Sequence, residues 1–518
     1  MHFIPPKLGH KQRASNPDPF LMLGEQKIEV VEKTKFLGLI WDSKLNFKAH
    51  IEYIKKKCMK AMNILRVLAH SDWGADQSTL LHLYRALVRS KLDYGCIVYG
   101  SARESYLKKL DPIQNNALRL CLGAFRSTPI ESLYVEADES PLEYRRNKLA
   151  LQYGIELKAN RDIPSYEYVF PTNYTYKTCQ RKSANPSFRV RLQSLLDESG
   201  IDFDDVADSD DLLDLPVWDI PPVKCLTHLA EYNKDDTSPY LYKHEFKIIE
   251  DQLSDFHCIY TDGSKCNEKV ACAFVTKNGT ISYRLPDNIS IFTAEAKAVE
   301  RALQFIKVNC VSKKFIIFTD SMSLIQSIQN ANLKNPLIGT ILRDNYRIGK
   351  QGKELLFCWV PSHCGIPGNE KADRAAKVAL NNPIHHFNIP YTDKIPLIKN
   401  FLYKKWQTEW DRLVGNKPHA IKPHLGPPFL VHSSRKDQVV LNRIRVGHSR
   451  LTHSYLMKNE TEKSKPKCHF CTSDSNLTVK HIIIDCTYFS AIRSNYFDVS
   501  TMKELFDNVH ADNILGFV

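Results

Sequence analysis

Four acidic residues stand where a fold of strands and helices could gather them. Asp262 follows the hydrophobic run "FHCIYT" and Asp320 follows "KFIIFT", while Glu295 and Asp373 lie in segments with helical periodicity. Each residue alone has an ordinary explanation. An aspartate after a strand is a common turn residue, and a glutamate in a first helical turn complements the helix dipole.

A cluster of these four carboxylates would be a metal site. Crowded carboxylates repel one another and destabilise a fold unless a cation neutralises them. Clustered carboxylate oxygens suit Mg²⁺ or Mn²⁺ better than zinc. Two such ions stabilise the attacking and leaving oxygens of an in-line phosphoryl displacement. The four residues therefore predict a two-ion site for phosphoryl chemistry.

The stretch "WVPSHCGIPGNEKAD" (359–373) adds His363, in a loop rich in proline and glycine. A histidine beside a metal cluster could relay a proton or assist product release. The alternative is an exposed loop histidine with no chemical role.

The elements around these residues predict how they would meet. The periodicity gives three short strands, a helix capped by Thr293, a strand, a helix, a strand and a final helix, over 256–262, 270–277, 280–286, 293–309, 314–320, 322–330, 353–360 and 368–380. If the first and fourth strands pair in parallel, Asp262 and Asp320 emerge side by side. We therefore predict a mixed α/β fold with a five-stranded mixed sheet flanked by helices.

The motifs "YTDGS", "TAEAKAV", "FTDS" and "WVPSHCGIPGNEKAD" occur in the order found in the type 1 ribonuclease H domain, which this part of the chain resembles. The resemblance implies that the four carboxylates bind two Mg²⁺ (or Mn²⁺) ions and that His363 is the family's loop histidine. It implies hydrolysis of the RNA strand of RNA–DNA hybrids, leaving 5′-phosphate and 3′-hydroxyl ends. Gly263, Ser264 and Asn369 are the expected substrate contacts.

The flanks resemble a retroelement protein. Cellular members tend to have polar residues where Ile291 and Phe292 stand here. "TKFLGLIWDSKLNFKAHI" (34–51) resembles the segment after the catalytic palm of non-LTR retrotransposon reverse transcriptases, and the helices that follow would be their basic, thumb-like region. The Tyr-x-Asp-Asp-like hairpin of the polymerase is absent from the sequence. We expect the C-terminal part of a longer pol protein, without polymerase activity of its own.

Near the C-terminus the spacing Cys468-x2-Cys471-x9-His481-x4-Cys486 predicts a tetrahedral zinc site. His469 is a competing ligand, and reduced cysteines without metal are the alternative. The pattern resembles the Cys-Cys-His-Cys knuckle of the same retroelement proteins, which implies nucleic-acid binding or structural stapling.

The bulk composition agrees with a nucleic-acid partner. The 518 residues carry a net charge of +13, and the 14 cysteines are thinly scattered, which favours a polyanionic partner and a reducing compartment. No signal peptide or membrane span is evident. We expect an intracellular protein of the nucleus or cytoplasm that is not secreted and makes no membrane contact.

Five regions are expected along the chain. Between Leu195 and Leu215 there are nine acidic residues and no basic one, typical of a weakly ordered linker. The regions are a reverse-transcriptase remnant with thumb-like helices, an acidic linker, a ribonuclease H domain, a connector with helices and a zinc-knuckle-like tail, over 1–165, 166–250, 251–382, 383–460 and 461–518.

The leading hypothesis is a metal-dependent ribonuclease H acting in retrotransposon reverse transcription. The alternative is a non-catalytic nucleic-acid-binding remnant of a truncated element. A stand-alone host ribonuclease H is disfavoured, because it would need neither the thumb-like segment nor the knuckle.

Overall fold

The computed structural model describes residues 20–518 except 172–185, 209–221, 234–235, 310–311, 334, 432, 458–464 and 473. The chain divides into two compact units that are each built from separate stretches of sequence. The first comprises Met1–Leu151, Thr175–Glu198 and Lys399–Val518, and the second comprises Gln152–Tyr174 and Ser199–Ile398. The second unit contains the four carboxylates.

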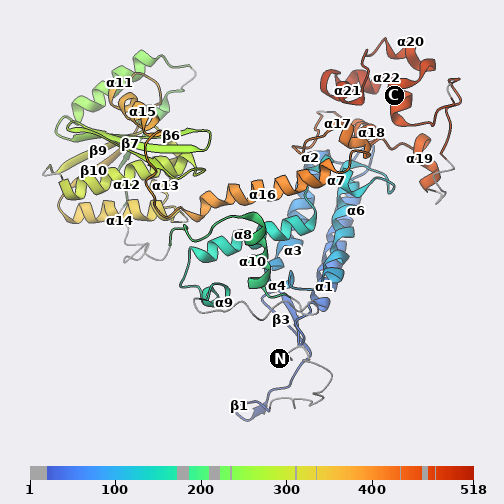
Figure 1. Ribbon diagram of the computed structural model, residues 1–518, viewed down its shortest axis with the longest axis horizontal. Coiled ribbons are helices and arrows are strands. Elements are labelled where there is room, and N and C mark those ends of the chain that lie inside the picture. Colours follow the sequence, from blue (N-terminus) through green and yellow to red (C-terminus); the bar gives the residue numbers. More distant parts are fainter. Residues whose placement is uncertain are drawn as a thin grey trace. The chain divides into compact units, whose positions relative to one another are not determined.

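The second unit is built on a six-stranded mixed sheet (Figure 1). Its order is β5-β10-β9-β6-β7-β8, with β5 Cys225–Leu226, β6 His257–Cys266, β7 Lys269–Thr276, β8 Gly279–Leu285, β9 Lys314–Thr319 and β10 Glu354–Trp359. The strands β6, β7 and β8 pair antiparallel, whereas β9 pairs in parallel with both β6 and β10. The predicted pairing of the first and fourth strands is therefore confirmed, and the short β5 adds a sixth strand to the five expected.

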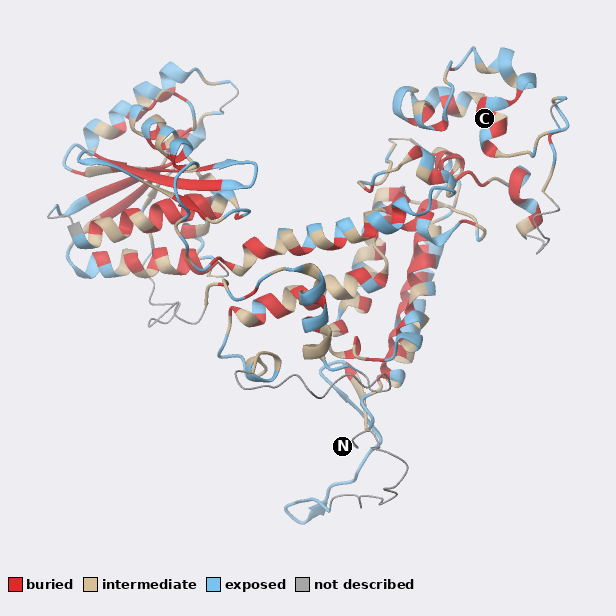
Figure 2. Cartoon of the chain, in the orientation of Figure 1, coloured by how far each residue is buried: buried red, intermediate tan, exposed pale blue. Residues whose placement is uncertain are grey.

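Helices cover both faces of this sheet. In Figure 1, α12 (Ile291–Asn309) and α14 (Pro336–Lys350) lie on one face, and α11 (Pro239–Gln252) and α15 (Pro367–Ala379) lie on the other. Side chains alternate along a strand. Phe315 and Ile317 of β9 therefore pack into the hydrophobic core beneath α12 and α14, and Ile316 and Phe318 pack into the core beneath α11. Figure 2 shows the middle of the sheet buried, whereas the strand ends include exposed residues.

Two helices differ from the sequence prediction. The helix α12 begins at Ile291, because the Ser290 hydroxyl accepts a hydrogen bond from the Thr293 amide at 3.1 Å. Ser290, not Thr293, therefore caps it. The helix α14 was not predicted, although Asn335 caps it by accepting from the Leu337 amide.

The acidic linker predicted over 166–250 is wrong for the described parts of that stretch. Helix α10 (Phe188–Ser199), strand β5 and helix α11 all lie within it. In the acidic segment itself, Phe203 and Val206 are buried, and Val206 forms a β-bridge with Ile389. The charges are paired as well, with Asp205 bound to Lys394 at 2.7 Å. Residues 209–215 lie outside the described part of the chain.

The first unit is mainly helical. The strand expected over 35–42 is instead a hairpin of β3 (Lys33–Phe36) and β4 (Leu39–Asp42), since Leu37 and Gly38 both have positive φ angles that reverse the chain. The helices α1 (Lys48–Leu68), α2 (Gln77–Tyr84), α6 (Asp111–Leu122) and α7 (Ile130–Ala137) follow. The apolar face of α1, made by Ile51, Ile54, Cys58, Met62 and Leu65, is buried.

The expected separation of an N-terminal region from a connector over 383–460 does not hold within this unit. Helix α18 (Arg435–Val446) packs on the N-terminal helices. Arg435 donates to the carbonyl of Cys121 at 2.8 Å, and Arg445 pairs with Glu136 at 3.0 Å. Because these groups are buried, the C-terminal helix supplies partners that the N-terminal helices need.

We expect Glu136→Gln to lower the free energy of unfolding of the first unit by about 3–5 kcal/mol, because it leaves the buried Arg445 guanidinium without its counter-charge. Urea unfolding followed by circular dichroism measures the change. Glu104→Gln is the matched control, since Glu104 pairs with Lys108 in full exposure to solvent. Equal effects of the two substitutions would contradict a structural role for the buried pair.

Candidate active site

Parallel strand pairing places the first two carboxylates next to each other. Thr261 of β6 is in register with Thr319 of β9, and each is followed directly by its aspartate. Asp262 is buried and Asp320 is half-buried. Asp320 directly follows the end of β9, whereas Asp262 lies within β6, because that strand continues to Cys266 and does not end at residue 262 as predicted. The parallel register with β9 nevertheless brings the two aspartates together.

Glu295, in the second turn of α12, completes a compact group with these two aspartates. One carboxylate oxygen from each of the three residues lies within 4.8 Å of the other two. The approach of α12 depends on Gly263, where a Cβ atom would lie 2.8 Å from the Glu295 amide nitrogen and 2.9 Å from the Ala294 Cβ. A larger residue would therefore push α12 and its carboxylate away from β6.

Asp373, the fourth predicted ligand, lies on α15 outside this compact group. Its carboxylate is bound by Lys377 at 2.8 Å, one helical turn further on. It is nevertheless near enough for its charge to raise the pKa values of Asp262, Glu295 and Asp320. The lysine was missed in the sequence, although its i,i+4 spacing from Asp373 was a usable signal.

The surroundings of the three clustered carboxylates raise the pKa of each of them. Burial, followed by the charges of Asp320 and Asp373, raises the pKa of Asp262 to about 8. Burial, followed by the charges of Asp262 and Asp320, raises the pKa of Glu295 well above its usual value. Burial also raises the pKa of Asp320, against the opposing effect of a hydrogen bond from Asn369.

The chemistry of this donor set fits a divalent cation. Oδ2 of Asp262 and Oε2 of Glu295 are buried without a hydrogen-bond partner among the described residues. Buried carboxylate oxygens without donors are costly, and a hard cation such as Mg²⁺ would satisfy them. Asp262, Glu295 and Asp320 are thus the residues that would hold it.

The remaining predicted residues lie around the cluster in different environments. His363 is exposed, in the loop between β10 and α15, and its charge lowers the pKa of Asp320. Ser264 and Asn369 are buried, and Asn369 hydrogen-bonds Asp320, so that it positions a carboxylate. The indole of Trp359 donates to the Asp320 carbonyl at 3.0 Å, a contact that no motif in the sequence indicated.

A second group of residues that could hold a metal ion lies in the first unit. Cys468, Cys471, His481 and Cys486 each offer a ligand atom within 4.8 Å of the other three. The Cys468 and Cys486 sulfurs are 3.9 Å apart, and the Cys471 sulfur is 3.4 Å from Nε2 of His481. Three thiols and one imidazole at these separations match a structural zinc site. His469 is exposed and is not part of the group.

The sheet order, its covering helices and the carboxylate cluster define the class of this region. Residues 255–381 match the family model of RNase H, so the chain contains an RNase H domain. This confirms the predicted resemblance and the fold class.

The relatives of this region include retroviral and retrotransposon proteins. The Pol polyprotein of equine infectious anemia virus (strain Wyoming) is 34% identical over 137 residues, which are 26% of this chain and 11% of that protein. A probable RNA-directed DNA polymerase from transposon X-element of Drosophila melanogaster is 27% identical over 28% of this chain and 16% of its own length. A Pol polyprotein from the type-1 retrotransposable element R1 of Bradysia coprophila is 25% identical over 27% of this chain and 14% of its own. The chain thus spans only about a tenth to a sixth of the length of these three relatives.

In the metal-free protein, Asp262→Asn should change how stability depends on pH. The pKa of Asp262 in the folded protein is raised from 3.8 to about 8. The stability that this carboxyl group contributes is therefore fully present at low pH, and it is lost progressively as the pH rises from about 4 through the folded value. Asparagine cannot lose a proton. The free energy of unfolding in a chelator should therefore fall in the wild type, relative to the variant, by up to about 1.4 kcal/mol per pH unit between about pH 5 and pH 7.

Urea titrations at several pH values measure this difference. Asp251→Asn is the control, since Asp251 is exposed, and it should follow the wild-type slope. An Asp262→Asn slope identical to that of the wild type would show that the carboxylate is not held in its raised-pKa environment.

We expect the purified chain to carry one zinc ion, and Cys471→Ser to lose it, because a structural site needs all four ligands. Metal content and thiol reactivity measure this. Cys266→Ser is the control, since that cysteine is exposed and lies outside the group. Wild-type protein whose three ligand cysteines react with thiol reagents as fast as Cys266 would contradict the site.

Proposed function

We propose that residues 255–381 hydrolyse the RNA strand of RNA–DNA hybrids in a reaction that depends on Mg²⁺ or Mn²⁺. The observation that carries this proposal is the group of three carboxylates from β6, α12 and β9, with buried oxygens that lack donors, inside an RNase H fold. Asp373, brought near by α15, completes the acidic site.

Each residue would have a separate part in the reaction. The bound ions would activate a water molecule and stabilise the charge on the phosphate. Asp262, Glu295 and Asp320 would hold the ions, and Asn369 would fix the orientation of Asp320. His363, exposed beside Asp320, would move a proton or help the product to leave.

The substrate follows from the chemistry of the two strands. A hybrid offers 2′-hydroxyl groups on one strand only, and these distinguish the RNA strand from the DNA strand. The exposed side of α1 supports a further nucleic-acid contact, since it carries Lys55, Lys56, Lys57 and Lys60 opposite its buried face. The Cys-Cys-His-Cys group would add another such contact in the first unit.

The relatives suggest the setting in which this reaction takes place. We propose that the chain acts on hybrids formed during reverse transcription of a retroelement, in the nucleus or cytoplasm, and that it supplies no polymerase activity. None of the described helices is long and apolar enough to cross a membrane.

Cleavage of a labelled RNA–DNA hybrid by the full chain with Mg²⁺ tests the proposal. We expect the RNA strand of the hybrid to be cut, and duplex RNA and duplex DNA to remain intact. Asp320→Asn should lower the rate by roughly 10³-fold, because an ion that stabilises the transition state by several kcal/mol would lose a ligand. Asp251→Asn makes the same change of charge at an exposed site of the same unit and should leave the rate unchanged.

Binding of the hybrid by folded wild-type protein without any cleavage would contradict the proposal. It would favour the alternative of a nucleic-acid-binding remnant that no longer catalyses.

A further inference from the structure

The loop that carries His363 is anchored by the residues that follow it. Cys364 and Ile366 are buried in the hydrophobic cluster beneath the loop, whereas His363 between the strand and these anchors is exposed. His363 also has a φ angle of 57°, a conformation that non-glycine residues rarely adopt. Surrounding contacts must therefore hold the loop in this conformation.

Helix α11, which precedes the region matched by the RNase H model, supplies part of these contacts. Tyr242 and Phe246 of this helix belong to the same hydrophobic cluster as Cys364 and Ile366. The helix therefore packs against the inner side of the histidine loop, in addition to covering the sheet.

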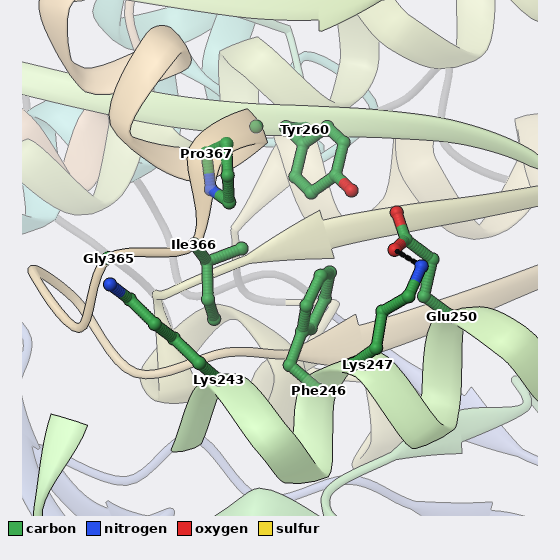
Figure 3. Close-up of a pocket in the computed structure, with 9 residues that line it drawn as sticks. Lys243, Phe246, Lys247, Glu250, Tyr260, Gly365, Ile366 and Pro367 are labelled. Carbon is green, nitrogen blue, oxygen red and sulfur yellow. Dashed lines mark hydrogen bonds and ion pairs between the residues drawn. The ribbon is translucent and has the colours of Figure 1, made fainter. Parts of the chain in front are cut away.

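The loop comes close to α11 at Gly365. A Cβ atom at this glycine would lie 2.1 Å from Cε of Lys243 and 2.5 Å from its Nζ. Gly365 has a φ angle of 76°, so both its conformation and its space favour glycine. Figure 3 shows the Lys243 side chain lying alongside the loop at this point.

Beside this contact the loop borders open space. A cavity of ≈ 420 Å³ lies between α11, Tyr260 of β6 and the end of the loop at Gly365 and Ile366. A loop with space behind it can move unless its remaining contacts prevent it. The side chain of Lys243 lines this cavity beside Gly365.

Lys243 and its neighbour Lys247 have different surroundings. Lys247 is bound to Glu250 at 2.9 Å and to Asp251 at 3.1 Å. Lys243 is exposed, and its ammonium lies 5.9 Å from the centre of the Tyr240 ring. The end of its side chain, at Cε and Nζ, is what lies against the loop.

We propose that α11 holds the histidine loop in its working conformation, with Lys243 as a positioning residue that acts on His363 through Gly365. The inference rests on the proposed function to the extent that His363 takes part in the reaction. Since the contact lies behind the loop, it determines the rate of the step that His363 assists and leaves hybrid binding unchanged.

Steady-state cleavage of the hybrid by three variants of the full chain tests this role. Lys243→Ala should lower kcat roughly tenfold with KM unchanged, because a small misplacement of a catalytic group costs rate. Lys243→Met keeps an unbranched stem and should restore kcat. Lys247→Ala is the matched control, one helical turn further along α11, and should behave as the wild type.

Two results would overturn the inference. A rise in KM shared by Lys243→Ala and Lys243→Met would assign the ammonium to a contact with the substrate. Additive losses in Lys243→Ala and His363→Ala would show that the two residues act independently, whereas we expect the double variant to match His363→Ala.

Amide hydrogen exchange over residues 362–366 tests the contact without any catalysis. We expect Lys243→Ala to speed exchange in this loop, and Lys243→Met and Lys247→Ala to leave it unchanged. Unchanged exchange in Lys243→Ala would refute the positioning role. If the wild type cuts no hybrid, the proposed function fails, and the exchange result still decides whether α11 holds the loop.

Discussion

Electrostatic repulsion among buried carboxylates is the constraint on which the second unit depends. Asp262, Glu295 and Asp320 come from two strands and a helix, and their oxygens lie within 4.8 Å of one another. Such a group forms only if the strands and the helix that carry it are held firmly enough to resist its repulsion. The hydrophobic cores on the two faces of the sheet provide that resistance.

Segments outside the RNase H region also help to hold the elements of the carboxylate site in place. Helix α11 closes one face of the sheet and supports the histidine loop. At the opposite border, the Ser290 hydroxyl, which caps α12, donates to Asp393 at 2.8 Å. The helix that carries Glu295 is therefore fixed at its start by a residue beyond 255–381. The site thus draws on more of the chain than its motifs indicate.

The first unit shows the same interleaving of distant segments. Buried hydrogen bonds from Arg435 and Asn442 satisfy the carbonyls of Cys121 and Leu122. The zinc-type ligand group belongs to this unit as well. Since buried polar groups need partners, the C-terminal helices are part of the fold of the N-terminal ones.

The sequence by itself determined the sheet, the parallel pairing that joins Asp262 to Asp320, and both groups of candidate ligands. Strand and helix periodicity is local, and metal ligands require particular side chains at short spacings. The order of the acidic stretch could not be predicted from the sequence, because its ion pairs are made with residues far along the chain. Asp205, for example, pairs with Lys394.

Only the tertiary structure decided that Asp373 stands apart with Lys377, that Asn369 holds Asp320, and that Lys243 lies against Gly365. These contacts depend on the position at which each helix packs on the sheet. That position results from many packing interactions, which no short motif encodes.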